Sequence, residues 1–572
     1  MVSALADAAE YMQTEWKEMS LVELMDMVIG EMACKADALS DAPKTLAEAL
    51  SRPDKDLWWQ AAVKEVQALE ESGTYTIRPK QLGDKPIGSR WVLRVKRNPD
   101  GSVERYKGRV VAKGFSQKPG IDYEETFSPT AKWAALRAIL ALGALEDMEI
   151  ESVDISSAFL NGELDKDITM NVFEGLRDMR PHLFKDGPKR DSDWVLELHT
   201  SLYGLKQSPR QWYKKLHSVM CELGFERVQC DNSIWVYKKD STRIIVPVYV
   251  DDMTIVAKNK SDVAWVKSEL KKHFKLRDLG PTNFLLGVHV TRDRSRRMLQ
   301  LSQRQAIDDI LAKFDITGLN TVKSPMDPNV KLSRSQCPQT EAEKAKMQSV
   351  RYREAVGSLM YLAIATRPDI AYAVGVLSRF SSNPGPEHWT AVTRVFRYLK
   401  GTKDYKLTYA PDPKSKSLFS TYCDADYGGD PDNMRSTSGY VVKMGTGAIS
   451  WKSKLQTICA LSTTKAEYIS AVTAAQEMLW LSNLFKELGY PVTSAMPLFI
   501  DNKSAIAVAQ NPEHHGRMKH LDLRYYWLRD TVEAGIIKVA YVNTLEQPAD
   551  VLTKNLGTNK MPIGCSLLGL QV

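Results

Sequence analysis

The order of apolar and polar positions along the chain predicts mixed α and β structure in two successive patterns. In the first, apolar residues recur at helical spacing, and shorter apolar runs bounded by turn residues predict strands between the helices. These helices are expected at 131–146, 209–223 and 262–273, and the strands at 150–154, 233–237 and 243–250. After a helix-rich stretch from about 321 to 402, strands at 418–423 and 439–444 open a second α/β pattern that ends near residue 554.

A β-hairpin with a basic face is predicted ahead of these helices. Residues 89–96 alternate apolar and basic side chains, and Asn98-Pro-Asp-Gly101 turns the chain into 103–112. Between residues 85 and 118, ten Lys or Arg stand against two acids, so this segment carries +8 while the whole chain carries +7. Basic residues interleaved with Trp91, Tyr106 and Phe115 suit a nucleic-acid strand or nucleotide phosphates. A solvated strand face is the alternative.

Two adjacent carboxylates mark the tip of a second, tight hairpin. The apolar runs 243–250 and 253–256 are separated only by Asp251-Asp252, which predicts a two-residue loop. Neighbouring carboxylates repel each other unless a cation lies between them, so the motif indicates a metal site; a solvent-facing acidic turn is the alternative. Asp154 ends another apolar run, and three acids from two strand ends suffice to hold a pair of divalent ions.

Several ordered motifs between about Trp58 and Asp315 resemble the reverse transcriptase of copia-type LTR retrotransposons. They are Asp154 followed by Phe159, Ser201-Leu-Tyr-Gly-Leu-Lys-Gln207-Ser-Pro-Arg210, Tyr249-Val-Asp-Asp252, Arg105-Tyr-Lys-Gly-Arg-Val-Val-Ala-Lys-Gly-Phe115, and Phe127-Ser-Pro-Thr130. The resemblance implies an RNA-directed DNA polymerase of right-hand architecture. Its parts would be fingers, a palm with a ferredoxin-like sheet, and a helical thumb or connection.

The resemblance also implies roles for individual residues. Asp154 and Asp251 would be the main metal ligands, with Asp252 the third acid of the catalytic set. Phe159 would be the steric gate against a ribose 2′-hydroxyl, for which an ordinary core aromatic is the alternative. Gln207 would lie beside the incoming nucleotide, for which a surface loop residue is the alternative. The remaining substrate-binding candidates are Tyr249 and, for the triphosphate, Lys107, Arg109 and Lys113.

Four further acids follow strand ends and helix starts in the second pattern. Asp424 ends a strand, Glu467 is expected in the first turn of a long helix, Asp501 follows a strand, and Asp550 lies in a helix that begins with a proline. Such positions converge at one edge of an α/β sheet, although each acid taken singly suits a cap or surface residue. Together they resemble the metal-binding set of the ribonuclease H domain that follows the polymerase in copia-type elements. Asp426 is the neighbour most easily confused with Asp424, and His520 is a weaker candidate for the same site.

The expected fold is therefore an α+β multi-domain protein, in which a right-hand polymerase is followed by an α/β ribonuclease H-like domain. The predicted segments are a helical N-terminal extension at 1–52, fingers and palm at 53–320, helical thumb or connection at 321–415, the ribonuclease H-like domain at 416–556 and a C-terminal tail at 557–572. The capsid, protease and integrase regions of the family do not fit into 52 upstream residues, so a fragment, cleaved product or truncated copy is expected.

Composition fits an ordinary globular protein. Mean hydropathy is −0.32, the 572 residues suffice for two to four domains, and seven scattered cysteines predict reduced thiols in a cytoplasmic or nuclear compartment. We expect Mg²⁺ or Mn²⁺, two ions per active site, and as partners an RNA template, a DNA primer, the RNA–DNA hybrid and dNTPs, with no membrane. A homodimer and association with virus-like particles stay open. So does a second function, a domesticated relic that binds nucleic acid without catalysis.

Overall fold

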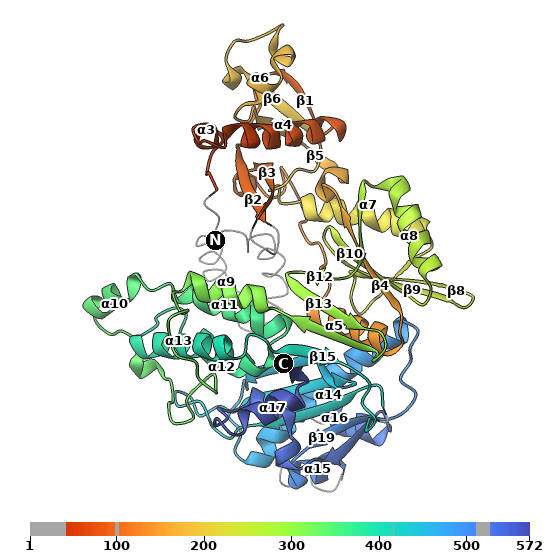
Figure 1. Ribbon diagram of the computed structural model, residues 1–572, viewed down its shortest axis with the longest axis vertical. Helices are drawn as coiled ribbons and strands as arrows, with labels where there is room; N and C mark the ends of the chain where they lie inside the picture. The colour runs from red at the N-terminus through yellow and green to blue at the C-terminus, as the bar shows by residue number, and fades with distance from the viewer. Residues whose placement is uncertain (1–41, 98–101, 416, 511–526) are drawn as a thin grey trace.

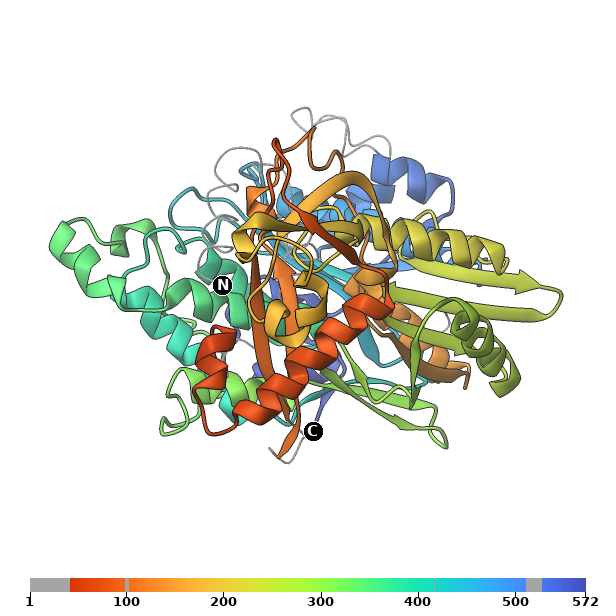
Figure 2. The same cartoon turned by 90° about the horizontal axis from the view of Figure 1, so that it is seen from above.

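The computed structural model describes residues 42–97, 102–415, 417–510 and 527–572 (Figure 1). Most of the predicted N-terminal helix and the candidate His520 lie outside these residues. Helices α10 to α13 and helices α7 and α8 lie on opposite sides of the molecule in both views (Figures 1 and 2). Within the described part of the chain, no helix combines the length and the apolar character that crossing a bilayer requires.

The N-terminal region packs one long helix against two small sheets. Its elements are α3 (Leu46–Leu50), α4 (Lys55–Glu71), α6 (Leu176–Met179), the sheet β1-β6-β5 with β1 (Tyr75–Pro79), β5 (Glu163–Asn171) and β6 (Trp194–Thr200), and the hairpin β2 (Ser89–Arg97) and β3 (Val103–Ala112). The predicted basic hairpin is thus confirmed. Of the three aromatics, Trp91 is buried in the core, and Tyr106 is half-buried with its ring centroid 4.6 Å from that of Trp58. Phe115 alone of the three is well exposed, at 80%.

A six-stranded antiparallel sheet forms the centre of the first half. Its order is β11-β4-β10-β9-β8-β7, with β4 (Glu149–Ile155), β7 (Glu226–Arg227), β8 (Ile234–Lys239), β9 (Thr242–Tyr249), β10 (Asp252–Ala257) and β11 (Leu276–Pro281). Helices α7 (Ser208–Glu222) and α8 (Lys260–His273) cover one face and α5 (Trp133–Leu145) the other. Both faces are therefore buried, which explains why 243–250 reads as a continuous apolar run.

A second sheet joins segments that are distant in sequence. Its order is β12-β13-β14-β15-β21, with β12 (Phe284–Leu285), β13 (Val288–Asp293), β14 (Met298–Ser302), β15 (Lys406–Tyr409) and β21 (Leu570–Gln571). Its strands lie on both sides of the boundaries expected at 320 and 415. The C-terminal residues are not a loose tail, because α17 (Met561–Leu567) packs and β21 pairs with β15. The helices between β14 and β15 are α9 (Arg304–Lys313), α10 (Glu341–Gln348), α11 (Tyr352–Ala365), α12 (Ala371–Ser378) and α13 (Pro386–Gly401).

The C-terminal sheet has the order β18-β17-β16-β19-β20, antiparallel at first and parallel from β16 onwards. Its elements are β16 (Ser420–Ala425), β17 (Thr437–Met444), β18 (Gly447–Leu455), β19 (Met496–Ile500), β20 (Ile537–Tyr541), α14 (Thr463–Glu487), α15 (Lys503–Gln510) and α16 (Trp527–Glu533). Along the chain, β16, β17 and β18 are followed by α14, β19, α15, α16 and β20, which confirms the second α/β pattern predicted from the sequence.

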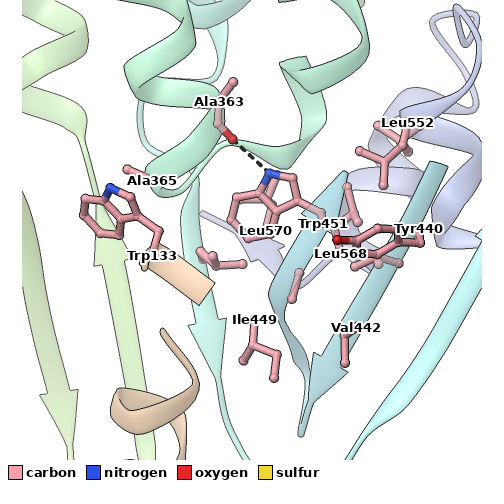
Figure 3. Close-up of a cluster of buried hydrophobic side chains, with 14 of the residues drawn as sticks. Trp133, Ala363, Ala365, Tyr440, Val442, Ile449, Trp451, Leu552, Leu568 and Leu570 are labelled. Carbon is pink, nitrogen blue, oxygen red and sulfur yellow. Dashed lines mark hydrogen bonds between the residues drawn. The ribbon is translucent and has the colours of Figure 1, made fainter. Parts of the chain in front are cut away.

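The central sheet with α5 and the C-terminal sheet share one apolar core. Figure 3 shows this core where β18 meets α5 and α11. The Trp451 indole N–H donates to the Ala363 carbonyl at 3.0 Å. The Arg137 guanidinium lies 3.8 Å over the Trp451 ring and donates to the carbonyls of Ile449 and Ala365. The arginine that interrupts the apolar sequence of α5 is thus buried, and it ties the central sheet to the C-terminal sheet.

Candidate functional site

The first group of acids lies at the tip of the β9–β10 hairpin. Strand β9 ends at Tyr249 and Asp252 pairs with it, so the two-residue loop is Val250-Asp251 and not the predicted Asp251-Asp252. The loop is shifted because Asp252 also pairs with Asp154 on β4 and so belongs to the ladder. Val250 adopts φ of 59°, which is unfavourable for a β-branched residue. The Trp212 indole N–H donates to its carbonyl at 2.8 Å and holds the turn.

The hairpin brings Asp154, Asp251 and Asp252 to one end of the sheet. Asp154 and Asp252 face each other in the β4–β10 register, and the Ile155 amide donates to the Asp251 carbonyl at 2.9 Å. Burial and the nearby Asp154 carboxylate raise the pKa of Asp251 above its ordinary value. The Asp154 charge therefore disfavours ionisation of Asp251, and a cation between them would relieve this repulsion.

These acids form one wall of a cavity of about 770 Å³. Tyr249 lines it too, and basic residues from several elements make up much of the remainder: Lys64, Arg94, Arg105, Lys107, Arg109, Lys275 and Arg277. A cavity with acids on one wall and basic side chains around it suits a polyanion that brings its own cations.

Three predicted substrate-binding residues lie outside this lining. Phe159 is half-buried in the short 3₁₀ helix 158–161, and its ring centroid is 5.3 Å from that of Tyr203. Gln207 is buried, accepts from the Gln117 amide at 3.1 Å and donates to the Asp122 carbonyl at 2.9 Å, which excludes the surface-loop alternative. Lys113 is exposed beyond the end of β3. The roles expected for these residues stay predictions.

Glu65 on α4 is a cavity residue that the sequence reasoning missed. It faces β3, and burial, opposed by the charge of Arg109, raises its pKa to about 7. The signal was present, because Trp58, Ala62, Val66 and Leu69 form the buried face of α4 and Glu65 lies on the same face. An acid within an apolar helical face is a candidate for a site.

The second group of acids is more compact. Asp424 lies in β16, Asp501 directly after the adjacent parallel strand β19, and Asp550 in the 3₁₀ helix Pro548–Leu552. One carboxylate oxygen from each lies within 4.8 Å of the other two. The predicted convergence at the edge of the sheet is thus present in the structure.

Glu467 completes this group from α14. The helix is capped by Ser462 and begins at Thr463, so Glu467 starts the second turn and not the first, as the sequence analysis expected. Its carboxylate is buried, and Oε2 has no hydrogen-bond partner among the described residues. Burial and the charges of Asp424 and Asp501 raise its pKa to about 10. A buried acceptor left without a donor indicates an absent cation or water.

A lysine lies among these acids. Lys554 Nζ is 2.8 Å from Asp550 Oδ1 and 3.5 Å from Asp424 Oδ2, and the Thr553 hydroxyl donates to the same Asp424 oxygen. Burial lowers the pKa of the ammonium, but the two carboxylates raise it further, so the lysine stays charged. Burial and Asp424 raise the pKa of Asp550 to about 7.

The donor set of this second group fits a hard divalent cation. Asp424, Asp501 and Asp550 offer carboxylate oxygens within 4.8 Å of one another, the ligand type that Mg²⁺ and Mn²⁺ prefer, and Glu467 with its unpaired oxygen lies close to Asp424 and Asp501. Asp426, the near neighbour of Asp424, is engaged elsewhere, because its carboxylate accepts from the Thr437 amide.

Comparison with known proteins places the first of these sites in a family. The family described as "Reverse transcriptase (RNA-dependent DNA polymerase)" matches residues 72–328, which contain Asp154, Asp251 and Asp252. The "Retrovirus-related Pol polyprotein from transposon TNT 1-94" of Nicotiana tabacum is 42% identical over 530 residues, covering 92% of this chain and 39% of the relative. Residues 72–328 therefore match the reverse transcriptase family, and most of the chain is similar to part of a retrotransposon Pol polyprotein.

A second relative gives the same result. The corresponding polyprotein of transposon RE1 from Arabidopsis thaliana is 36% identical over 535 residues, 93% of this chain and 35% of the relative. The chain thus spans about two-fifths or less of the length of these relatives. Among solved structures, a foamy viral protease-reverse transcriptase in complex with double-stranded DNA aligns over 87% of this chain and 71% of its own, at 11% identity and a TM-score of 0.20. A score this low does not define a common fold.

Proposed function

We propose that this copia-type Pol chain is an RNA-directed DNA polymerase that also cleaves the RNA strand of the resulting RNA–DNA hybrid. One observation carries the proposal: two separate groups of carboxylates, one facing a basic cavity and one drawn together at a sheet edge. Each group needs cations to balance its charge, and phosphoryl transfer is the reaction class that such acid clusters serve.

The regions of the fold take the family's subdomain names in this proposal. Helix α4 and the β2–β3 hairpin correspond to the fingers, the six-stranded sheet with α5, α7 and α8 to the palm, and α9–α13 with their sheet to the thumb or connection. The sheet β18-β17-β16-β19-β20 with α14 corresponds to the ribonuclease H domain. The cavity between the β2–β3 hairpin and the acids Asp154, Asp251 and Asp252 is the position for the primer end and the nucleotide.

In polymerisation, Asp154 and Asp251 hold the cations with Asp252 as the third acid. Two Mg²⁺ or Mn²⁺ ions would supply activation of the primer 3′ hydroxyl and neutralisation of the leaving pyrophosphate. Lys107 and Arg109 line the cavity and bind the triphosphate of the dNTP, with Lys113 further along β3 as a third contact. Phe159 excludes a ribose 2′-hydroxyl, and Gln207 and Tyr249 orient the incoming nucleotide.

In hybrid cleavage, the residues at the sheet edge play the corresponding part. Asp424, Asp501 and Asp550 with Glu467 bind a second pair of Mg²⁺ or Mn²⁺ ions, which would supply a nucleophilic water and stabilise the leaving oxygen. The partners of the whole chain are then an RNA template, a DNA primer, their hybrid and dNTPs. We place this activity in the cytoplasm, within virus-like particles, and in the nucleus, and leave homodimer formation to direct measurement.

Primer extension on an RNA template, with Mg²⁺ or Mn²⁺ as the only divalent ion, tests the proposal. Extension that chelation of the ions abolishes supports the polymerase. A domesticated relic would bind the primer–template with the same affinity but extend nothing. The presence of all seven acids favours the enzyme over the relic, because loss of selection would be expected to alter some of them.

A further inference from the structure

Lys554 lies where a cation is expected to lie, and this position has a consequence for the second acid site. We infer that Lys554 is a built-in counter-cation of the ribonuclease H site, which a divalent cation must displace in order to bind. The inference rests on the proposed function of that site. It makes Lys554 a positioning residue that sets how tightly the site binds Mg²⁺.

The contacts of Lys554 support this role. Its ammonium lies 2.8 Å from Asp550 Oδ1 and 3.5 Å from Asp424 Oδ2, so that it bridges two members of the triad. One oxygen from each of these acids and one from Asp501 lie within 4.8 Å of one another. An ammonium that contacts two of three mutually close carboxylates occupies part of the space that a ligated ion would need.

The local chain allows the ammonium to enter and to leave. Lys554 follows Asp550 by four residues, across the end of the 3₁₀ helix, so local structure keeps the lysine within reach of this carboxylate. The two carboxylates are nearly inaccessible, at 12% and 3% for Asp550 and Asp424, whereas the lysine side chain is 42% exposed. The acids therefore stay in place when the flexible lysine swings into solvent.

Charge balance supplies the reason for the competition. Three aspartates bring negative charge into a largely buried region beside Glu467, and Lys554 offsets part of this charge. The Glu467 Oε2 atom remains without a donor in this arrangement. One divalent ion offsets two charges and can also use that oxygen, so it replaces the lysine, but it must first overcome the attraction of Lys554 to Asp550 and Asp424.

Site-resolved cation binding tests the inference without measuring enzyme activity. Fe²⁺ is bound to the full chain, and ascorbate and peroxide are then added. The hydroxyl radicals that form at the iron cut the backbone nearby. Fragments ending near residues 424, 501 and 550 report this site separately from fragments ending near 154 and 251. Mg²⁺ is then titrated to suppress the cuts. In Lys554→Met, we expect suppression at about ten-fold lower Mg²⁺ than in the wild type, because a close positive charge is gone.

Three further variants make the result decisive. Lys554→Gln also lacks the charge but can still donate to Asp550. It should give the same Mg²⁺ requirement as Lys554→Met, and it replaces that variant if Lys554→Met folds poorly. Lys554→Arg keeps the charge and should retain the wild-type Mg²⁺ requirement. Lys538→Met removes an exposed lysine of β20 in the same domain and should change nothing.

Two outcomes contradict different claims. An unchanged or higher Mg²⁺ requirement in both uncharged variants overturns the role of Lys554 and leaves the cation site intact. An absence of cuts near the three aspartates in the wild type, or cuts that persist at full strength in Asp501→Asn, overturns the cation site itself and with it the proposed ribonuclease H activity.

Discussion

The two acid sites balance their negative charge in different ways. At the hairpin tip, Asp154, Asp251 and Asp252 face a cavity of about 770 Å³ whose basic residues come from other elements. At the C-terminal sheet, three aspartates converge within 4.8 Å, and a lysine from the same short segment contacts two of them. The first site is open and suited to a large ligand that arrives with cations. The second is compact and partly neutralised before any ligand arrives.

Topology explains much of this difference. Asp154 and Asp252 lie on adjacent antiparallel strands, and the hairpin loop leaves Asp251 beyond the ladder, toward the cavity. Asp424 and Asp501 lie at the carboxyl ends of two adjacent parallel strands, and such ends meet at one edge of a sheet. The 3₁₀ helix that carries Asp550 closes this edge, which leaves a small site.

The largest effect should come from Asp251→Asn, which breaks the open site. Loss of a carboxylate ligand should lower primer extension at least about 10³-fold, because several kcal/mol of transition-state stabilisation depend on the cations. Hybrid cleavage on a preformed RNA–DNA duplex should continue near the wild-type rate. Extension at an unchanged rate would show that the hairpin acids are not the polymerase site.

Asp501→Asn should produce the reverse result with a somewhat smaller loss. Cleavage of the hybrid should fall about 10²- to 10³-fold, because three of the four acids remain. Primer extension by the same preparation should be preserved. Asp426→Asn is the matched control, since Asp426 lies beside Asp424 but its carboxylate is engaged by the Thr437 amide. If the control loses as much cleavage as Asp501→Asn, the ligand set has been misassigned.

Phe159→Ala sharpens the comparison within the open site. If the ring excludes the 2′-hydroxyl, removing it should raise ribonucleotide incorporation relative to deoxyribonucleotide by about ten-fold or more. If the ring only packs against Tyr203, selectivity should stay constant while the free energy of unfolding falls by up to about 3–5 kcal/mol. Incorporation ratios measured beside melting curves separate the two results.

The smallest expected effect is a pH dependence of stability that belongs to the compact site. Burial and Asp424 raise the pKa of Asp550 from 3.8 to about 7, so the folded chain binds a proton more tightly than the unfolded chain. The stabilisation that this proton provides is present below pH 3.8 and is lost as the pH rises toward about 7.

Melting temperatures in the presence of a chelator check this sign. Asp550→Asn, which cannot ionise, should gain stability relative to the wild type as the pH rises through that window, and saturating Mg²⁺ should reduce the gain. A difference between the two proteins that does not vary with pH would mean that Asp550 titrates normally.

Local patterns in the sequence predicted much of the fold and the acids of both sites. The basic hairpin, the strand of Asp154 and the α/β order of the C-terminal half all follow from periodicity and turn residues. The loop of the acidic hairpin was misplaced by one residue, because no local signal shows that Val250 adopts a positive φ. That conformation is stabilised by Trp212, whose indole contact arises only in the folded chain.

Long-range contacts were beyond the reach of sequence patterns. Arg137 interrupts an apolar helix, and its acceptor on Ile449 is 312 residues away. Trp91 looked like a nucleic-acid contact, yet it is buried and donates to the Glu174 carbonyl, whereas Tyr106 packs against Trp58 of α4 and also lines the cavity. The contact of Lys554 with Asp550 could have been predicted, since the spacing of four residues is visible in the sequence.

Strand β21 has a consequence for the order in which the chain folds during synthesis. It completes a sheet that begins at Phe284, by pairing Leu570 with Leu407 on β15. Once β15 has been made, the ribosome must therefore translate about 160 further residues, including the whole C-terminal sheet, before the open edge of β15 is covered. Until then that edge can pair with another nascent chain. The two halves of the chain thus mature together, and an early stop within the C-terminal half leaves an aggregation-prone edge in the N-terminal half as well.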